Sequence, residues 1–191
     1  MTTSSDPRPL LHDSMGQAGK MISCVSPGQL HLATPCSEFD VTDLLAHLVG
    51  VAYRVASIAR LEPQDDLVQV TNVSDDGWAN AYHAPHIEAI AAWEDAALLD
   101  TEIELPWGKF PGRFVVDMYA LETTVHTWDL AAATDQVEAL DPALAEACLP
   151  IATPMLPPEH RGGDIPFGPV VTVPDGAPAY TRLAAYLGRT T

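Results

Sequence analysis

Two side chains that can bind a metal ion interrupt an apolar helical pattern in this sequence. Across residues 113–133, Glu122 and His126 fall among apolar residues that recur at spacings of three and four. Residues four apart in an α-helix differ by only about 40° around its axis, so the carboxylate and the imidazole can converge on one point. A polar group buried without a partner costs on the order of 2–7 kcal/mol, and a metal ion at that point would satisfy both groups.

His47 offers a third donor from a different helix. It lies on the flank of an apolar stripe that we expect to form a helix over residues 40–60. Two imidazoles and one carboxylate leave coordination positions open, which is typical of a catalytic divalent metal rather than of structural zinc. We therefore take His47, Glu122 and His126 as candidate metal ligands, and these donor types suit zinc, nickel or ferrous iron.

A plainer interpretation of these residues stays open. The spacing Glu-x-x-x-His is common, and on a helix surface it forms an ion pair worth about 0.2–0.5 kcal/mol instead of a ligand set. Asp129, one turn beyond His126, is either an acceptor that orients the imidazole or an ordinary polar residue near a helix end. The pattern identifies no catalytic base.

Other chemically capable residues give weaker signals. Cys36 is either a nucleophile or a small buried thiol. His83 and His86 have a spacing that can hold a metal, but their polar neighbours favour a solvated pair. Three aromatic residues either line a pocket or pack in the core: Trp107, Phe110 and Trp128.

The net charge of the chain limits the classes of molecule that it can bind. The 191 residues include 9 Lys and Arg against 26 Asp and Glu, which gives a formal net charge of −17. Binding to nucleic acid or to an anionic membrane draws on clustered Lys and Arg, so we expect neither partner. We expect instead a small-molecule substrate and a monomer or homodimer.

Cysteine usage and hydropathy favour a cytoplasmic protein. Three cysteines without a CxxC pair do not make a disulfide framework or a Cys-rich zinc site. The sequence has no run of about 18 uncharged apolar residues and no basic flank followed by an apolar region. We therefore expect neither a membrane span nor a leader, and a single domain over residues 1–191.

The periodicities predict a mainly helical chain. We expect helices at 7–23, 40–60, 85–99, 113–133, 142–150 and 179–187, and a strand and turn at 101–112. The fold class that follows is all-α: a four-helix bundle with short extended segments and extra C-terminal helices.

Three further expectations concern details of these elements. The third helix should bury Ile87, Ile90, Ala91 and Trp93. Residues 170–173 should form an extended piece. Residues 61–78 should form an acidic surface connection over the binding site, with acids that include Asp65, Asp66, Asp75 and Asp76.

Several segments resemble the DinB-like metalloprotein superfamily, and more narrowly the branch related to the N-terminal domain of mycothiol-dependent maleylpyruvate isomerase. The segments are TPCSEFDVTDLLAHLVG at 34–50, LPWGKFPG at 105–112 and LETTVHTWDLA at 121–131. The later segments LPPEHRGG, FGP and RLAAYLGR resemble the endings of single-domain members. The likeness covers most of the chain.

The resemblance implies a four-helix bundle that holds a divalent metal, usually zinc or nickel, through His47, Glu122 and His126. Many members of this superfamily are thiol-dependent transferases or isomerases in which the metal binds and activates a low-molecular-weight thiol. We do not expect the second domain that completes the active site of the isomerase, so the resemblance does not extend to isomerization of maleylpyruvate itself.

Two functions of different classes follow. The first is a metal-dependent enzyme that transfers a thiol to a small electrophile or isomerizes it through thiol addition. The second is a non-enzymatic protein of the same fold that binds a metal or a small molecule. The open three-ligand arrangement favours the first.

Overall fold

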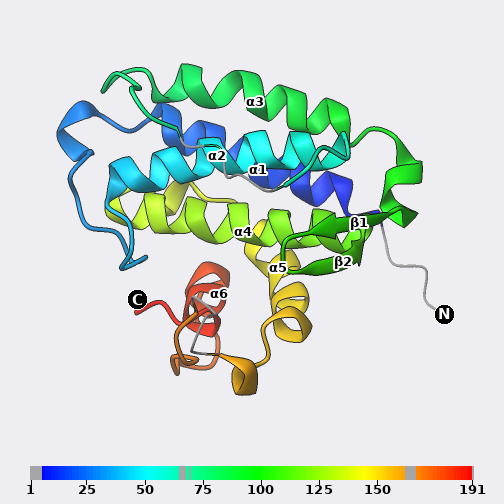
Figure 1. Ribbon diagram of the computed structural model, residues 1–191. Helices are drawn as coiled ribbons and strands as arrows, with labels where there is room; N and C mark the ends of the chain where they lie inside the picture. Colours follow the sequence, from blue (N-terminus) through cyan, green and yellow to red (C-terminus); the bar gives the residue numbers. More distant parts are fainter. Residues whose placement is uncertain (1–5, 65–67, 69, 162–166, 191) are drawn as a thin grey trace.

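The described part of the chain is mostly helical. The computed structural model describes residues 6–64, 68, 70–161 and 167–190, which form six α-helices and one two-stranded antiparallel sheet (Figure 1). The helices are α1 (Arg8–Ser23), α2 (Val41–Ala59), α3 (Trp78–Ala92), α4 (Gly112–Ala133), α5 (Pro142–Met155) and α6 (Ala179–Tyr186). The strands are β1 (Glu102–Leu105) and β2 (Gly108–Pro111). Asp65 and Asp66 of the expected acidic connection lie outside the described residues.

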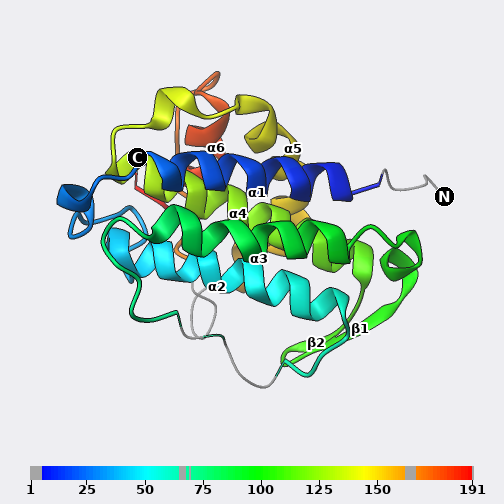
Figure 2. The same ribbon diagram turned by 90° about the horizontal axis from the view of Figure 1, so that it is seen from above.

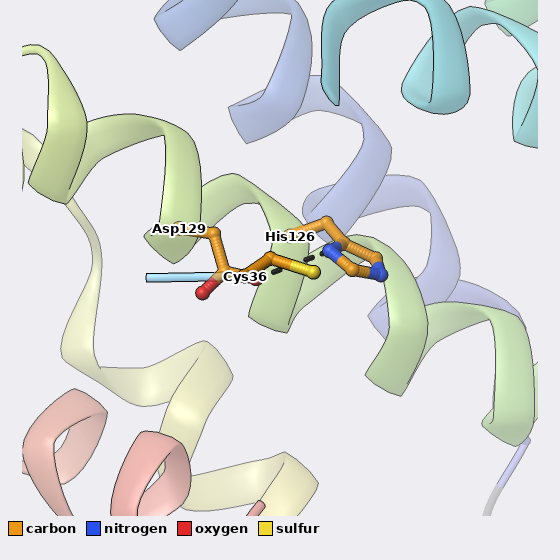
Figure 3. Close-up of side chains that lie close together, drawn as sticks. All are labelled: Cys36, His126 and Asp129. Atoms are coloured by element: carbon orange, nitrogen blue, oxygen red, sulfur yellow. Dashed lines mark hydrogen bonds and ion pairs between the residues drawn. The ribbon is translucent and has the colours of Figure 1, made fainter. Parts of the chain in front are cut away.

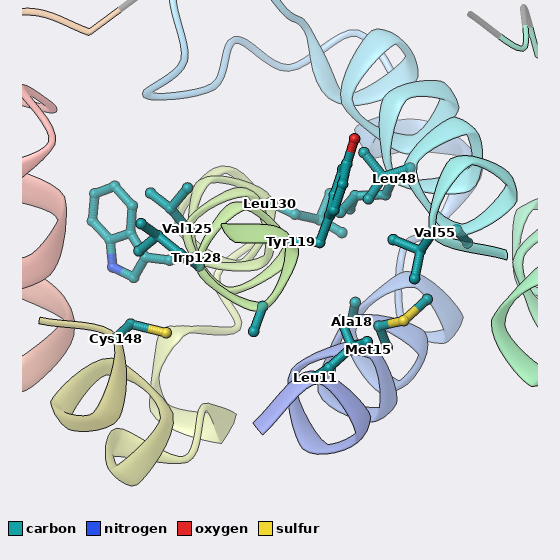
Figure 4. Close-up of a cluster of buried hydrophobic side chains, with 14 of the residues drawn as sticks. Leu11, Met15, Ala18, Leu48, Val55, Tyr119, Val125, Trp128, Leu130 and Cys148 are labelled. Atoms are coloured by element: carbon teal, nitrogen blue, oxygen red, sulfur yellow. The ribbon is translucent and has the colours of Figure 1, made fainter. Parts of the chain in front are cut away.

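The four longest helices lie side by side around a common core. Helix α1 packs against α3 and α4, and α2 packs against the same two helices (Figures 1 and 2). Helices α5 and α6 pack on each other and against α4. Figure 4 shows core side chains between α1, α2 and α4, and a second group between α4 and α5 that includes Val125, Trp128 and Cys148.

Helix α2 follows from its capping residues and its apolar stripe. Asp40 accepts a hydrogen bond from the backbone N–H of Asp43, and the Asp43 carboxylate accepts from the N–H of Asp40 in return. By length and composition alone, Val41–Ala59 is also apolar enough to cross a membrane. Its packing against α3 and α4 accounts for this apolar character as that of a core helix.

Helix α3 begins earlier than the sequence predicted. The helix starts at Trp78 instead of Pro85 and ends at Ala92, and residues Ala96–Asp100 form a separate 3₁₀ turn. A proline inside a helix costs about 3 kcal/mol, which is why Pro85 suggested a start. Burial of Trp78 and Tyr82 in the core offsets that cost, and the Tyr82 hydroxyl donates to the Met15 carbonyl oxygen at 3.1 Å.

The expected buried face of α3 was therefore partly wrong. Ile87 is 54% exposed and Ala91 is exposed, whereas Trp93 is buried and Ile90 packs against the core. The buried positions instead follow the earlier start, at spacings of three and four: Trp78, Tyr82, Pro85, Ala89 and Trp93.

The hairpin before α4 was predicted correctly. Ile103 and Leu105 are buried and alternate with exposed glutamates, and β1 pairs with β2 in antiparallel register. The hairpin runs directly into α4, where a side chain at Gly112 would overlap the carbonyl oxygen of Leu98. Glycine at this position thus allows the 3₁₀ turn Ala96–Asp100 to lie close against the start of α4.

One expectation in the C-terminal region needs correction. Helix α5 continues to Met155, past the expected end at Pro150, because its N-terminal cap Asp141 and its buried contacts with α4 outweigh the interior prolines. Residues 170–173 belong to no strand of the described chain, and the backbone N–H of Val171 donates to the carbonyl oxygen of Ala185 in α6.

Candidate metal centre

The structure brings His47, Glu122 and His126 together between α2 and α4. One ligand-type atom from each side chain lies within 4.8 Å of the others. The Nε2 atom of His47 is 3.2 Å from Oε1 of Glu122, and the two imidazole ring centroids are 4.6 Å apart. The spacing in α4 and the position of His47 on the flank of α2 thus produce the predicted convergence of donors.

The Nε2 atom of His47 fits a metal ligand. This atom is buried and has no hydrogen-bond partner among the described residues, since its contact with Glu122 lacks hydrogen-bond geometry. A buried polar atom without a partner is destabilising, and a bound cation removes that cost. The donor set therefore suits a divalent ion.

Glu122 is held as a carboxylate. Burial acts to raise its pKa, but the contact with His47 and the nearby His126 and Arg54 outweigh burial, so the pKa lies below its usual value. Glu122 is thus ionised at neutral pH and supplies a negative donor oxygen.

His126 is oriented by Asp129. The imidazole Nδ1 lies 3.1 Å from Oδ2 of Asp129 (Figure 3), whose side chain is fully buried. When Nδ1–H donates to this carboxylate, Nε2 carries the free lone pair that a metal requires. The interpretation of Asp129 as an orienting acceptor is therefore the one that the geometry favours.

Arg189 is the residue of the site that the sequence did not predict. Its Nη2 donates to Oδ2 of Asp129 at 3.1 Å, and its Nε donates to Oδ1 at 3.3 Å. Both side chains are buried, and their opposite charges neutralise each other. The chain has only 9 Lys and Arg, and the need of Asp129 for a cation was the one signal that could have pointed to a basic partner.

Cys36 is a half-buried thiol beside His126 and Asp129. Its sulfur, with His126 and Asp129, forms a second group whose ligand-type atoms lie within 4.8 Å (Figure 3). Burial raises the pKa of the Cys36 thiol, so it stays protonated at neutral pH. Arg189 already pairs with both oxygens of Asp129, which leaves the group around Glu122 as the better cation site.

A cavity of about 500 Å³ opens from the candidate ligands. The hairpin contributes Trp107 and Phe110 to its wall, as one of the two interpretations of these residues expected, whereas Trp128 lies in the core. His83 and His86 belong to neither of the ligand-type groups within the described chain.

Comparison with known proteins finds a family match over the part of the chain that carries the candidate ligands. The family described as the mycothiol maleylpyruvate isomerase N-terminal domain matches residues 11–131, which include all three candidate ligands. Two uncharacterized proteins of Mycobacterium tuberculosis, one from each of two strains, are each 33% identical over 172 residues, covering 89% of this chain and 90% of the relative. No solved structure matches the chain.

Proposed function

Because the chain belongs to the family of the mycothiol maleylpyruvate isomerase N-terminal domain, we propose that it binds one divalent metal ion at His47, Glu122 and His126. The observation that carries the proposal is the buried Nε2 of His47, which faces the Glu122 carboxylate and has no hydrogen-bond partner among the described residues. Zinc is the expected ion, with nickel and ferrous iron as alternatives that the same donors accept.

The proposed activity is transfer of a low-molecular-weight thiol of the mycothiol type to a small electrophile, or isomerization through its reversible addition. A divalent metal at these ligands supplies a Lewis acid that lowers the pKa of a thiol, so that the thiolate forms at neutral pH. In an addition, a C–S bond forms at the electrophilic carbon, the π electron pair moves to the neighbouring atom, and that atom takes up the thiol proton.

The protein's own side chains have defined roles in this proposal. Glu122, with its lowered pKa, offsets part of the cation charge. Asp129 fixes the orientation of His126, and the ring of Phe39 stacks on His47 with centroids 5.1 Å apart. The two imidazoles are thus held in place by contacts that do not use their ligating nitrogens.

We further propose that helices α1 to α4 constitute a DinB-like four-helix bundle within one domain of a cytoplasmic protein. The mutual packing of these four helices and their family match support the bundle. The contacts of α5 and α6 with α4 support a single domain, and Met155 at the end of α5 and Leu187 just after α6 contribute to the wall of the cavity.

The test combines elemental analysis with turnover. Protein purified without chelator should contain about one divalent ion per chain, and a panel of thiols with electrophilic substrates should reveal thiol-dependent turnover. His126→Ala should lose both the ion and the turnover. His83→Ala is the matched control, because His83 is an exposed histidine outside the centre, and it should retain both.

The alternative function makes a different prediction for the same experiment. If the metal is present and is lost in His126→Ala, but no thiol supports turnover, the protein is a non-enzymatic metal or small-molecule binding protein. Metal-free wild-type protein, or full metal content in a His47→Ala/His126→Ala variant, contradicts the metal site itself.

A further inference from the structure

The cavity beside the candidate ligands has a markedly apolar wall. Side chains from four parts of the chain face it: Phe39 before α2, Phe110 on β2, Phe114 and Met118 on α4, and Leu187 after α6. The rings of Phe110 and Phe114 stack with centroids 4.9 Å apart and an interplanar angle of 13°. Such a wall favours apolar ligands because burying their surface releases water from both partners.

The charged side chains of the cavity do not favour an anion. Its described lining includes two acids, Glu38 and Glu122, and one cation, Arg189. Arg189 is already paired with the buried carboxylate of Asp129. A substrate carboxylate placed against the apolar wall would therefore lose its water without gaining a cationic side chain among the described lining residues.

A second cavity reaches two of the same candidate ligands from the side of α2. This cavity, also of about 500 Å³, shares Phe39, His47 and Glu122 with the first. Its lining includes the charged residues Asp43 and Arg54 of α2. Under the proposed function, the thiol can approach the centre from this side, which leaves the apolar cavity for the other reactant.

We infer that the second reactant is a neutral, largely apolar molecule with an aryl or alkyl body, bound in the cavity between Phe110, Phe114 and Met118. The role of this molecule as a reactant rests on the proposed function. Its preferred binding in the cavity rests only on the apolar side chains of the cavity wall. The volume of about 500 Å³ is within the range of small-molecule sites and admits a body of one or two rings.

The probe for this cavity is the neutral fluorophore N-phenyl-1-naphthylamine, which brightens in apolar surroundings. Titration into the full-length protein should saturate at one probe per chain. Methyl cinnamate and cinnamate then serve as a matched pair of competitors, with the same body and either an ester or a carboxylate. In metal-free protein, where no bound ion can take up the carboxylate, the ester should displace the probe at least about tenfold more effectively than the acid, because Arg189 in the wall is already paired with Asp129.

Three single-residue variants test whether the probe binds in this cavity. Phe114→Ala should weaken probe binding by about tenfold, since an aromatic contact is lost. Met118→Gln keeps the side-chain volume but adds an amide, and it should also weaken binding while thermal unfolding verifies that the variant is folded. Ile87→Ala removes an exposed apolar side chain outside the cavity and is the control that should leave binding unchanged.

The outcomes separate this inference from the metal proposal. Probe binding with ester preference in the His47→Ala/His126→Ala variant supports the apolar cavity independently of the metal. A wild-type protein that binds metal but shows no saturable probe binding, or one whose cavity prefers cinnamate in that double variant, overturns the inference and leaves the metal centre standing. Equal weakening by Ile87→Ala and Phe114→Ala also overturns it.

Discussion

Arg189 and Asp129 form a buried ion pair between residues that are 60 positions apart in the chain. The guanidinium contacts both carboxylate oxygens, and one of these oxygens also lies 3.1 Å from Nδ1 of His126. A segment that follows α6 therefore fixes, through one carboxylate, the orientation of a candidate metal ligand in α4.

Removal of Arg189 should destabilise the protein strongly. Arg189→Met leaves the buried Asp129 carboxylate without its cation, a change that typically costs about 3–5 kcal/mol. Chemical denaturation measures the change in the free energy of unfolding. A variant that also carries Asp129→Leu should recover much of the loss, because no unpaired charge remains buried.

Arg182 offers a matched control for this prediction. Its guanidinium pairs with Glu146 at the protein surface, so Arg182→Met should cost only about 0–1 kcal/mol. If Arg189→Met is as mild as Arg182→Met, the buried pair does not have the stabilising role that the geometry assigns to it.

The sequence predicted those features that depend on the residue pattern within a single helix. The apolar stripes of α2 and α4 predicted these helices and marked His47, Glu122 and His126 as polar interruptions. The structure brings the three side chains together because all three lie on helix flanks that face one another. Whether they bind a metal stays a prediction for the experiments above.

The sequence did not predict the features that depend on contacts between distant segments of the chain. Pro85 carries a local signal for a helix start, yet burial of Trp78 and Tyr82 places the start seven residues earlier. The link from Arg189 to Asp129 joins segments that have no shared periodicity, so no local pattern reports it. Contacts of this kind require the folded arrangement of α4 and α6.

Glu122→Gln should weaken metal retention without abolishing folding. The amide removes the negative donor but keeps the size of the side chain, so elemental analysis after dialysis should find less metal than in wild type. Circular dichroism should show unchanged helix content. An unfolded variant, or one with full metal content after the same dialysis, contradicts the role given to Glu122.

In metal-free protein, the stability difference between wild type and Glu122→Gln should depend on pH. Folding lowers the pKa of Glu122 below its ordinary value of 4.5, so its ionisation stabilises the fold above pH 4.5. This contribution is lost as the pH falls through the lowered pKa of the folded state. The stability difference between wild type and Glu122→Gln should therefore be largest above that value and should shrink on acidification. Urea titrations at several pH values test the sign.

The three cysteines should react in an order set by their burial. Cys24 is exposed, Cys36 is half-buried, and Cys148 is buried with its pKa raised to about 11 by desolvation. Because the thiolate is the reactive form, iodoacetamide at pH 8 should modify Cys24 first, Cys36 more slowly, and Cys148 only after unfolding. Mass spectrometry of peptides gives the order, and rapid labelling of Cys148 in the folded protein would contradict its placement between α4 and α5.

The last prediction concerns the thiol. With three protein ligands, positions remain for an anionic sulfur donor, and two neutral imidazoles leave enough positive charge on the ion to favour thiolate. Cobalt-substituted protein should therefore gain a sulfur-to-metal charge-transfer band when a small biological thiol is added. The His83→Ala variant should give the same band, because His83 lies outside the centre, whereas His126→Ala should not. If cobalt-loaded, folded wild-type protein gives no spectral response to any biological thiol, the thiol-transfer proposal fails and the metal-binding alternative replaces it.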